Sequence, residues 1–312
     1  MTKYLFSIII PTYNEERDIA RTLNFILSQE YSTFEVIVVD DSIDNTAKIV
    51  EGYEDPRVKL VKPNVRRGRC EARNIGIKES QGDIIVILNA DVLLPHHFLS
   101  SINAHYLGGH DAVTVKNSVH NMENIYARYV GLHNLKKEAD GVILDRIDRL
   151  GFWWVEGFSA RRDLILATSL FPSGFPVPIE AGEDVRFVDE LRSIGCRGIY
   201  DGDIDVQHVA PDSFRDFWRV RKGRGHGTPQ IRMFIDDWPA IKVLGALLVK
   251  GCVRLVRVVT VVPVVVYSHR LLRHSRDRSV SELCKLGMLY SMEQVAFTVG
   301  EIESFLEILK KR

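Results

Sequence analysis

The chain has 312 residues, 46% hydrophobic and 26% charged, so it can bury a full core and is not a disordered polymer. Its four cysteines lie far apart and form no C-x-x-C pair, which excludes a zinc ribbon and a disulfide framework and favours a reducing compartment. A net charge of zero conceals an uneven distribution. Residues 1–212 contain 23 Lys and Arg against 32 Asp and Glu, a charge of −9, whereas residues 213–278 contain 14 against 4, a charge of +10.

The first hundred residues alternate between strand-like and helix-like segments. The opening run YLFSIIIP, which ends at Pro11, predicts a strand rather than a signal peptide. It is followed by NEERDIARTLNFILSQ, whose apolar residues share one helical face, with Asn14 as the expected cap. FEVIVVDD, RVKLVK and DIIVIL predict further strands, separated by two helical segments. This alternation predicts β-α-β units and a parallel sheet, in which ligands bind at the carboxyl ends of the strands.

Polar side chains follow these strands. Asp40 and Asp41 come after the second predicted strand, and Asn89 and Asp91 come after the fourth. A third acidic cluster, Glu183–Asp184, begins the amphipathic segment EDVRFVDELRSIG, which Gly195 is expected to end. Each cluster taken singly is also typical of a helix cap or a solvated turn, so their order along the chain is the stronger signal.

The tail from Ile241 to Tyr267 is apolar and long enough to span a bilayer. However, Lys242, Lys250, Arg254 and Arg257 interrupt it at spacings of 8, 4 and 3 residues, close to one helical stripe. Such a stripe favours a helix that lies in the membrane interface, and Pro263 is expected to kink or end that helix. The alternative is a pair of accessory helices packed on the preceding domain. Nucleic acid is the least favoured partner because the cations sit among valines.

Several motifs occur in one order: SIIIPTYNEE, VIVVDDSIDNT, GRCEARNIGIKESQGDIIVILNAD, GFSARRD, GEDVRF and QHV. Together they resemble the family 2 glycosyltransferases of GT-A fold, from residue 5 to about residue 210. The resemblance implies a Rossmann-like α/β domain with a mostly parallel central sheet and flanking helices. We therefore expect a GT-A catalytic domain at 1–212, a basic glycine-containing linker at 213–240 and a basic, apolar, membrane-associated helical segment at 241–312.

The resemblance also implies roles for individual residues. Those that hold the donor nucleotide are Pro11, Tyr13, Glu15 and Asp40, with Asp40 or Asp41 on the base or ribose, and with Arg73 nearby. Asp91 is implied to be the metal-binding carboxylate of the D-X-D motif, for Mg²⁺ or Mn²⁺. Glu183 and Asp184 form the catalytic Glu-Asp pair, with Asp184 facing the acceptor. His208 is either a further metal ligand or a hydrogen-bonded loop histidine.

The chain departs from the family pattern at Asn89, where the family often has Asp. The change removes one negative charge but retains an oxygen ligand, so we interpret Asn-Ala-Asp as a working metal site of weaker metal affinity, with Asn89 beside the donor nucleotide sugar. The alternative is a catalytically impaired, membrane-bound scaffold.

Three further sets of residues are weaker candidates. The glycine-rich stretch Arg219–Pro229 suits a mobile loop whose Arg221 and Arg224 close over a diphosphate, or else a solvated basic linker. It lacks the Q-x-x-R-W motif of processive members. Trp153 and Trp154 are expected to line the acceptor pocket, to join the core or to face the membrane. Arg161 and Arg162 are expected to meet an acceptor phosphate.

The resulting prediction is an inverting, metal-dependent hexosyltransferase. It would use a UDP- or GDP-linked sugar and a lipid-linked acceptor, either polyprenyl phosphate or a lipid-linked saccharide. We expect it at the cytoplasmic face of the cell membrane, peripheral or anchored through its C-terminal segment. A sugar-1-phosphate nucleotidyltransferase is less favoured because PTYNEERD lacks the glycine-rich, arginine-containing loop that such an enzyme would need.

Overall fold

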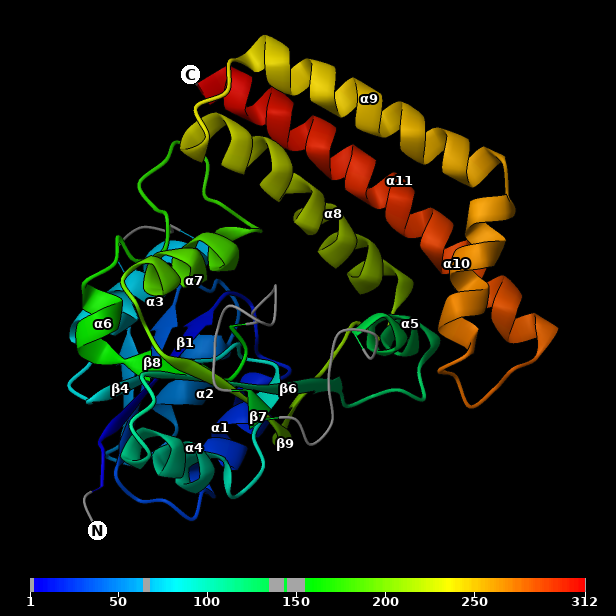
Figure 1. The fold of residues 1–312 in the computed structure, drawn as a ribbon. Helices are drawn as coiled ribbons and strands as arrows, with labels where there is room; N and C mark the ends of the chain where they lie inside the picture. Colours follow the sequence, from blue (N-terminus) through cyan, green and yellow to red (C-terminus); the bar gives the residue numbers. More distant parts are fainter. Residues whose placement is uncertain (1–2, 64–67, 135–142, 145–154, 312) are drawn as a thin grey trace. The chain divides into compact units, whose positions relative to one another are not determined.

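The computed structural model describes residues 3–63, 68–134, 143–144 and 155–311. The chain forms two compact units (Figure 1). The first comprises Met1–Ser118, Glu138–Gly174 and Glu183–His208, and the second Val119–Lys137, Phe175–Gly182 and Val209–Arg312. Two segments before residue 208 thus join the helices of the second unit, whereas the sequence predicts one boundary at residue 212.

One part of the first unit's sheet is parallel. It consists, in spatial order, of β3 (Val58–Val61), β2 (Phe34–Asp40), β1 (Phe6–Thr12) and β4 (Ile84–Ile87). The helices between these strands in the chain are α1 (Ile19–Leu27), α2 (Thr46–Glu51) and α3 (Gly68–Glu79). The central strands are almost continuous runs of buried Ile, Val and Phe, as expected when both faces of a parallel sheet are covered. All four strands have their carboxyl ends at the same edge.

The other part of the sheet is antiparallel. β8 (Phe158–Arg161) pairs with β4 and β6 (Ala112–Val119), and β9 (Gly198–His208) pairs with β5 (Val92–Leu93) and β7 (Ile143–Leu144). Helices α4 (Phe98–Leu107), α6 (Arg162–Leu166) and α7 (Glu183–Ser193) complete the unit. The predicted α/β class is confirmed. The pairs from β3 to β4 are parallel, whereas β4–β8, β6–β8, β5–β9 and β7–β9 are antiparallel.

Asn14 does not cap the first helix, contrary to the prediction. Helix α1 begins at Ile19, with Asp18 at its N-cap position. Asn14 instead adopts a φ of 58°, a left-handed conformation that Asn tolerates better than most residues. Its side-chain oxygen accepts a hydrogen bond from the backbone N–H of Ile43 at 3.1 Å. Asn14 therefore ties the loop after β1 to the loop after β2.

The second unit is helical. It contains α5 (Ile125–Asn134), α8 (Phe214–Gln230), α9 (Ala240–Val259), α10 (Val262–Leu272) and α11 (Val280–Lys311), with a π-helical turn at Ile231–Ile235. Figure 1 shows the long α11 lying between α8 and α9. As predicted, the apolar tail breaks next to Pro263: α9 ends, Val261 has a φ of 61°, and α10 starts with Pro263 in its first turn.

The stretch Arg219–Pro229 is not a mobile loop, so that prediction is wrong. It forms most of α8, and its glycines allow the backbones of α8 and α11 to come close together. A Cβ atom at Gly225 would lie 2.4 Å from the carbonyl oxygen of Phe297, and one at Gly300 of α11 would lie 2.0 Å from that of Lys222. The glycines that suggested flexibility therefore serve close helix packing.

Three glutamates of α11 each pair with an arginine from a different helix; Glu282 and Glu301 are buried and Glu293 is partly buried. The pairs are Arg128 of α5 with Glu282 at 2.7 Å, Arg221 of α8 with Glu293 at 3.2 Å, and Arg254 of α9 with Glu301. Breaking such a pair leaves an uncompensated buried charge, so the pairs favour one register of the three helices on α11. They also neutralise part of the basic charge that distinguishes this half of the sequence.

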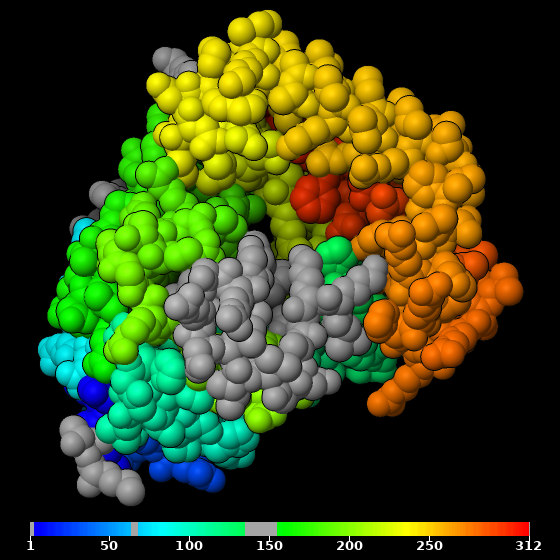
Figure 2. Space-filling view, viewed as in Figure 1, coloured from blue at the N-terminus to red at the C-terminus, as the bar shows by residue number. Residues whose placement is uncertain are grey.

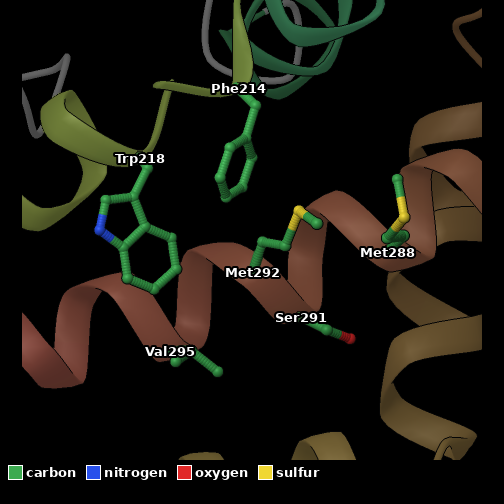
Figure 3. Close-up of a pocket in the computed structure, with 6 residues that line it drawn as sticks. All are labelled: Phe214, Trp218, Met288, Ser291, Met292 and Val295. Atoms are coloured by element: carbon green, nitrogen blue, oxygen red, sulfur yellow. The ribbon is translucent and has the colours of Figure 1, made fainter. Parts of the chain in front are cut away.

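An apolar hollow of about 530 Å³ opens between α8 and α11 (Figure 3). Its lining residues are Phe214, Trp218, Met288, Ser291, Met292 and Val295, none of which is a predicted site residue. Over the described part of the chain, no helix combines the length and the apolar character needed to cross a bilayer.

Candidate functional site

The loops after β1 and β2 form a cross-linked cradle at the carboxyl edge of the sheet. Asp40 is buried, and its Oδ1 accepts hydrogen bonds from the hydroxyls of Thr12 and Ser42, both at 2.6 Å. The backbone N–H of Asn14 donates to Ser42 Oγ at 2.7 Å, and that of Glu15 donates to the Thr46 hydroxyl at 2.9 Å. These bonds hold the two loops in a fixed relation before any ligand binds.

The predicted nucleotide-binding residues that follow β1 and β2 lie on this cradle. Pro11 lies near the end of β1, and the exposed Tyr13 and partly buried Glu15 lie in the loop that follows. Asp40 is fully engaged with Thr12 and Ser42, whereas Asp41 is only partly buried. Asp40 is therefore placed to shape the cradle, and Asp41 is the more accessible of the two carboxylates.

Asp91 and His208 meet because their strands pair. In the antiparallel pair of β5 and β9, Val92 lies opposite His208, so the residue before Val92 adjoins the histidine. The Nε2 atom of His208 lies 3.0 Å from Asp91 Oδ2. The Thr22 hydroxyl donates to the carbonyl of Ala90 at 2.6 Å and fixes the turn between Asn89 and Asp91. Both side chains remain about one quarter exposed.

The Asp91 carboxylate is held in its charged form. Burial raises the pKa of Asp91, but the charge and the hydrogen bond of His208 lower it by more. The pKa of Asp91 therefore lies below the ordinary value of an aspartate. Its other oxygen, Oδ1, is buried and accepts no hydrogen bond from the residues that the structure describes. Among those residues no three His, Cys, Asp or Glu side chains gather to form a metal site by themselves. Asp91 and His208 are thus two neighbouring side chains, one with an oxygen and one with a nitrogen, that could bind a metal ion together with other ligands.

The side chain of Asn89 hydrogen-bonds to Arg73 and Glu156, whereas Asp91 contacts His208. Its Oδ1 accepts from Arg73 Nη2 at 3.2 Å, and its Nδ2 donates to Glu156 Oε1 at 3.0 Å. Because a guanidinium only donates and a carboxylate only accepts, an amide satisfies both neighbours and an aspartate would not. Arg73 is buried, and its Nη1 also donates to Glu183 Oε1 at 2.9 Å.

Glu183 and Asp184 are adjacent but lie in different environments. Glu183 is buried; although burial alone would raise its pKa, the charges of Arg69 and Arg73 lower it below the ordinary value. Asp184 is only partly buried, and the combination of burial with the negative charges of Glu183 and Glu156 raises its pKa to about 6. Glu183 is therefore a structural anion, and Asp184 is the carboxyl group whose pKa suits proton transfer near neutral pH.

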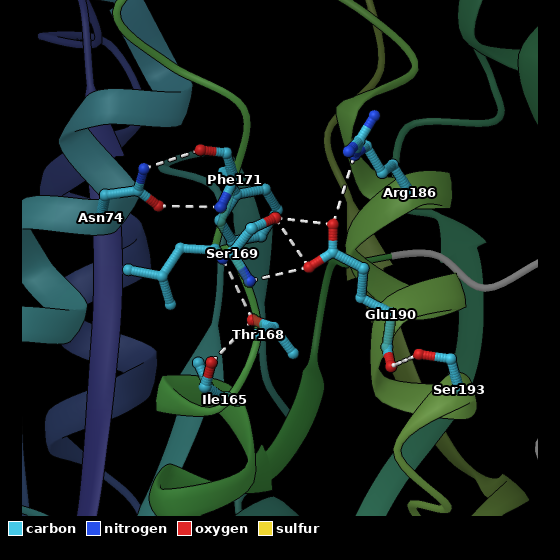
Figure 4. A network of polar contacts seen from close by, with 9 residues as sticks. Asn74, Ile165, Thr168, Ser169, Phe171, Arg186, Glu190 and Ser193 are labelled. Atoms are coloured by element: carbon cyan, nitrogen blue, oxygen red, sulfur yellow. Dashed lines mark hydrogen bonds and ion pairs between the residues drawn. The ribbon is translucent and has the colours of Figure 1, made fainter. Parts of the chain in front are cut away.

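A polar network fixes the helix that begins with this pair (Figure 4). Near the middle of α7, Glu190 accepts hydrogen bonds from the backbone N–H and the hydroxyl of Ser169, at 2.7 and 2.6 Å. Phe171 follows Ser169 by two residues. Its backbone N–H donates to Asn74 Oδ1 on α3 at 3.0 Å, and its carbonyl oxygen accepts from Asn74 Nδ2 at 2.7 Å. The segment 169–171 therefore ties α3 to α7, which brings Arg73 and Glu183 together.

Other predicted residues are not brought to this site. Arg161 pairs with Asp111 at 3.3 Å, and Arg162 donates to Ser80 Oγ at 3.2 Å. Because β8 runs antiparallel to β4, Arg161 lies opposite Ile84, at the end of β4 away from Asn89. Both arginines have protein partners away from the Asn-Ala-Asp turn, and a contact with an acceptor phosphate stays a prediction. Arg221 and Arg224 belong to the second unit, and Trp153 and Trp154 lie outside the described residues.

Glu156 is the participant that the sequence reasoning missed. It contacts Asn89 and adds to the negative charge around Asp184, yet it stands in the motif-free stretch before GFSARRD. The sequence signal that could have found Glu156 is its position two residues before the buried strand β8. Because β8 pairs with β4, Glu156 lies beside the Asn-Ala-Asp turn that follows β4.

Known proteins match both the sequence and the fold. Residues 7–166, just over half of the chain, match the family described as Glycosyl transferase family 2. The UDP-Glc:alpha-D-GlcNAc-diphosphoundecaprenol beta-1,3-glucosyltransferase WfgD of Escherichia coli is 39% identical over 92 residues, 29% of this chain and 36% of that protein. This chain matches only about a third of the length of WfgD and of two further relatives.

Two solved structures share the fold, each with a TM-score of 0.55. One is S. aureus TarS 1–349 in complex with UDP-GlcNAc, 21% identical, covering 72% of this chain and 66% of that one. The other is the mannosyltransferase PcManGT from Pyrobaculum calidifontis in complex with GDP-Man and Mn²⁺, 26% identical, covering 74% and 63%. The resemblance noted in the sequence is thereby confirmed: the chain belongs to glycosyl transferase family 2 and has a GT-A-like fold.

Proposed function

We propose that the chain is an inverting glycosyltransferase that moves a sugar from a nucleoside diphosphate donor to a lipid-linked acceptor at the membrane. The observation that supports this most is the arrangement at the carboxyl edge of the first unit's sheet. There Asp91 contacts His208 at the end of β9, and a hydrogen-bonded chain runs through Glu156, Asn89, Arg73 and Glu183. A donor diphosphate, its leaving-group charge and a proton acceptor for the nucleophile need such groups side by side.

The nucleoside would lie on the cradle of the β1 and β2 loops. Asp41 is the carboxylate there that is accessible to a base or ribose, and Tyr13 supplies an exposed ring. Arg69, exposed at the start of α3, lies 3.8 Å from Glu183 and extends positive charge from the buried Arg73 toward the solvent. A cation at this position favours the diphosphate that joins nucleoside and sugar.

The residues present fit a hard divalent cation such as Mg²⁺ or Mn²⁺. Asp91 Oδ1 is buried and accepts no hydrogen bond from the described residues, and His208 stands beside the same carboxylate. Mg²⁺ is commonly bound by one or two carboxylates plus substrate phosphates, which agrees with a set of only two side chains. When bound, the cation would offset the negative charge that develops on the leaving diphosphate. PcManGT, which binds GDP-Man and Mn²⁺, supports this assignment.

Asp184 would remove the proton of an acceptor hydroxyl. Its carboxyl is partly exposed, and its raised pKa makes it a better base than an ordinary aspartate while it remains ionised at neutral pH. A polyprenyl phosphate oxygen is already ionised and needs no base, so the role of Asp184 depends on which acceptor is used. The relative WfgD, a glucosyltransferase that acts on alpha-D-GlcNAc-diphosphoundecaprenol, favours a hydroxyl of a lipid-linked saccharide as the acceptor.

The first experiment is a screen of UDP- and GDP-linked hexoses, with Mg²⁺ or Mn²⁺ and with EDTA, that measures nucleotide release. Addition of membrane lipid extract should accelerate release from one donor if the acceptor is lipid-linked. Metal-dependent release with one nucleotide class would support the proposal. Failure to bind any nucleotide in calorimetry, with or without metal, would refute it and leave the impaired scaffold.

Asn89 is expected to work better than the Asp that the family often has. Replacing Asn89 by Asp would set two carboxylates against each other at the present 3.0 Å contact with Glu156, and we expect kcat/KM to fall about tenfold or more. Adding Glu156→Gln to the Asn89→Asp variant should restore most of the loss, because a glutamine amide can donate to the newly introduced carboxylate. A faster Asn89→Asp enzyme, or losses that simply add, would contradict this role of Asn89.

A further inference from the structure

The outward face of α9 is apolar over its whole length. Its outermost positions recur at spacings of three and four residues, and all are exposed: Ile241, Gly245, Leu248, Cys252, Val256 and Val259. The large side chains among them are 58–76% exposed, and the neighbouring Val249 is 65% exposed. The apolar surface continues across the break between the helices through Val262, Val265 and Val266 of α10. Monomeric soluble proteins rarely leave so long an apolar strip uncovered. Figure 2 shows α9 and α10 in yellow to orange.

The basic stripe of α9 does not point the way the sequence predicts. Lys250 and Arg254 both face α11, where they meet the buried carboxylate of Glu301, and they share the inner side of the helix with Val243 and Leu247. Arg254 is therefore paired with Glu301, and Lys250 lies toward the same carboxylate while its side chain stays 46% exposed. The structure removes them from the outer face and leaves that face without a charge.

Cations nevertheless border the apolar face. Lys242 lies over the ring of Trp238, 3.7 Å from its centroid, and Arg257, Arg270 and Arg273 are exposed along the same two helices and just beyond them. Residues 238–276 contain no Asp or Glu. An apolar face with a cationic border and an aromatic ring at its end is the pattern of a helix that lies in a bilayer interface.

We propose that α9 and α10 dock flat on an anionic bilayer, with the outer face of α9 among the acyl chains and the bordering cations among the lipid phosphates. This docking rests on the proposed function, because an enzyme with a lipid-linked acceptor has to reach that acceptor at the membrane. The experiment below measures membrane binding alone, so membrane docking and sugar transfer can fail independently.

A bilayer fits this surface better than a second copy of the chain. A symmetric dimer built on α9 would bring the border of Lys242 and Arg257 against an identical border, with no acidic residue between Trp238 and Arg276 to compensate. Inside its border, the face consists of aliphatic side chains with Gly245 and Cys252, and it lacks the central aromatic and arginine anchors that dominate protein interfaces. Anionic lipid supplies both the apolar medium and the negative charge.

The experiment is flotation of the full chain with vesicles of phosphatidylcholine alone or with about a third phosphatidylglycerol. The wild type should float with the anionic vesicles, and high salt should weaken the binding. Val249→Asp combined with Val256→Asp should lower the partition coefficient about tenfold or more, because both side chains are exposed in the folded protein and lose their lipid burial. Leu107→Asp, an exposed apolar residue of the first unit, is the matched control and should float like the wild type.

Each contrary result overturns the proposal. Absence of flotation with anionic vesicles refutes membrane docking, and undiminished flotation of the Val249→Asp/Val256→Asp variant refutes docking through α9. Equal binding to neutral vesicles refutes the role of the cationic border. A wild-type dimer in light scattering that the same double substitution dissociates would assign the face to a second copy. Circular dichroism of each variant confirms that it is folded.

Discussion

Replacing Asp91 by Asn is expected to lower sugar transfer at least about a hundredfold and to raise the Mn²⁺ or Mg²⁺ concentration needed for half-maximal rate. The substitution keeps the shape of the side chain but removes the charge that faces His208 at 3.0 Å. An amide at this position also cannot present two anionic oxygens to a cation. Transfer rates measured over a metal titration separate a loss of metal affinity from a loss of maximal rate.

Asp203→Asn provides the control for Asp91→Asn. Asp203 is exposed on β9, five residues before His208, and we expect its amide variant to transfer sugar within about twofold of the wild type, as for most surface substitutions. His208→Ala should fall between the two, because Asp91 remains. If Asp91→Asn retained full rate with an unchanged metal requirement, the Asn-Ala-Asp turn would be only a structural turn.

Replacing Asp184 by Asn is expected to lower kcat/KM for a hydroxyl acceptor by about 10² to 10⁴ while leaving donor affinity unchanged. The pH profile gives an independent measure. Because burial and the charges of Glu183 and Glu156 raise the pKa of Asp184 to about 6, the carboxyl is protonated and unable to accept a proton below that pH. The rate should therefore rise with pH through about 6 and level off above it.

Glu156→Gln tests the cause of that profile. It removes one of the negative charges that raise the pKa of Asp184, so the acid limb of kcat/KM should move to lower pH. Asp189→Asn, on the exposed side of the same helix, should leave both rate and profile unchanged. If Asp184→Asn retained transfer to polyprenyl phosphate with a flat profile, the nucleophile would be a phosphate oxygen and Asp184 would not act as a base.

The different environments of Glu183 and Asp184 arise only in three dimensions. In the sequence they are neighbouring acids at the start of a helix, and only the family resemblance singles out Asp184 as the one that faces the acceptor. The helical turn directs Glu183 inward, onto a guanidinium from a helix 110 residues earlier in the chain, and leaves Asp184 partly exposed. The segment from Ser169 to Phe171 that joins α3 to α7 has no motif of its own, so nothing local predicted the arrangement.

The sequence alone determined the α/β class, the strand ends that bear the functional residues, the break at Pro263 and the family. These follow from local patterns: the period of apolar residues, the turn chemistry and motifs carried on contiguous residues. The position of Asp91 at this edge also followed from the sequence, because a carboxylate after a buried strand lies at the carboxyl edge wherever the later strands go.

Only the tertiary structure decided which residues meet and which charges stay exposed. Asp91 adjoins His208 because β5 pairs with β9, more than a hundred residues later in the chain. Glu156 contacts Asn89 because β8 pairs with β4. The glycines of α8 are typical of a loop, but in the structure they allow α8 and α11 to pack closely. Lys250 and Arg254 belong to a basic stripe in the sequence, but in the structure both lie toward the carboxylate of Glu301. Contacts distant in sequence and the burial of charge depend on how elements pack, and no local pattern encodes them.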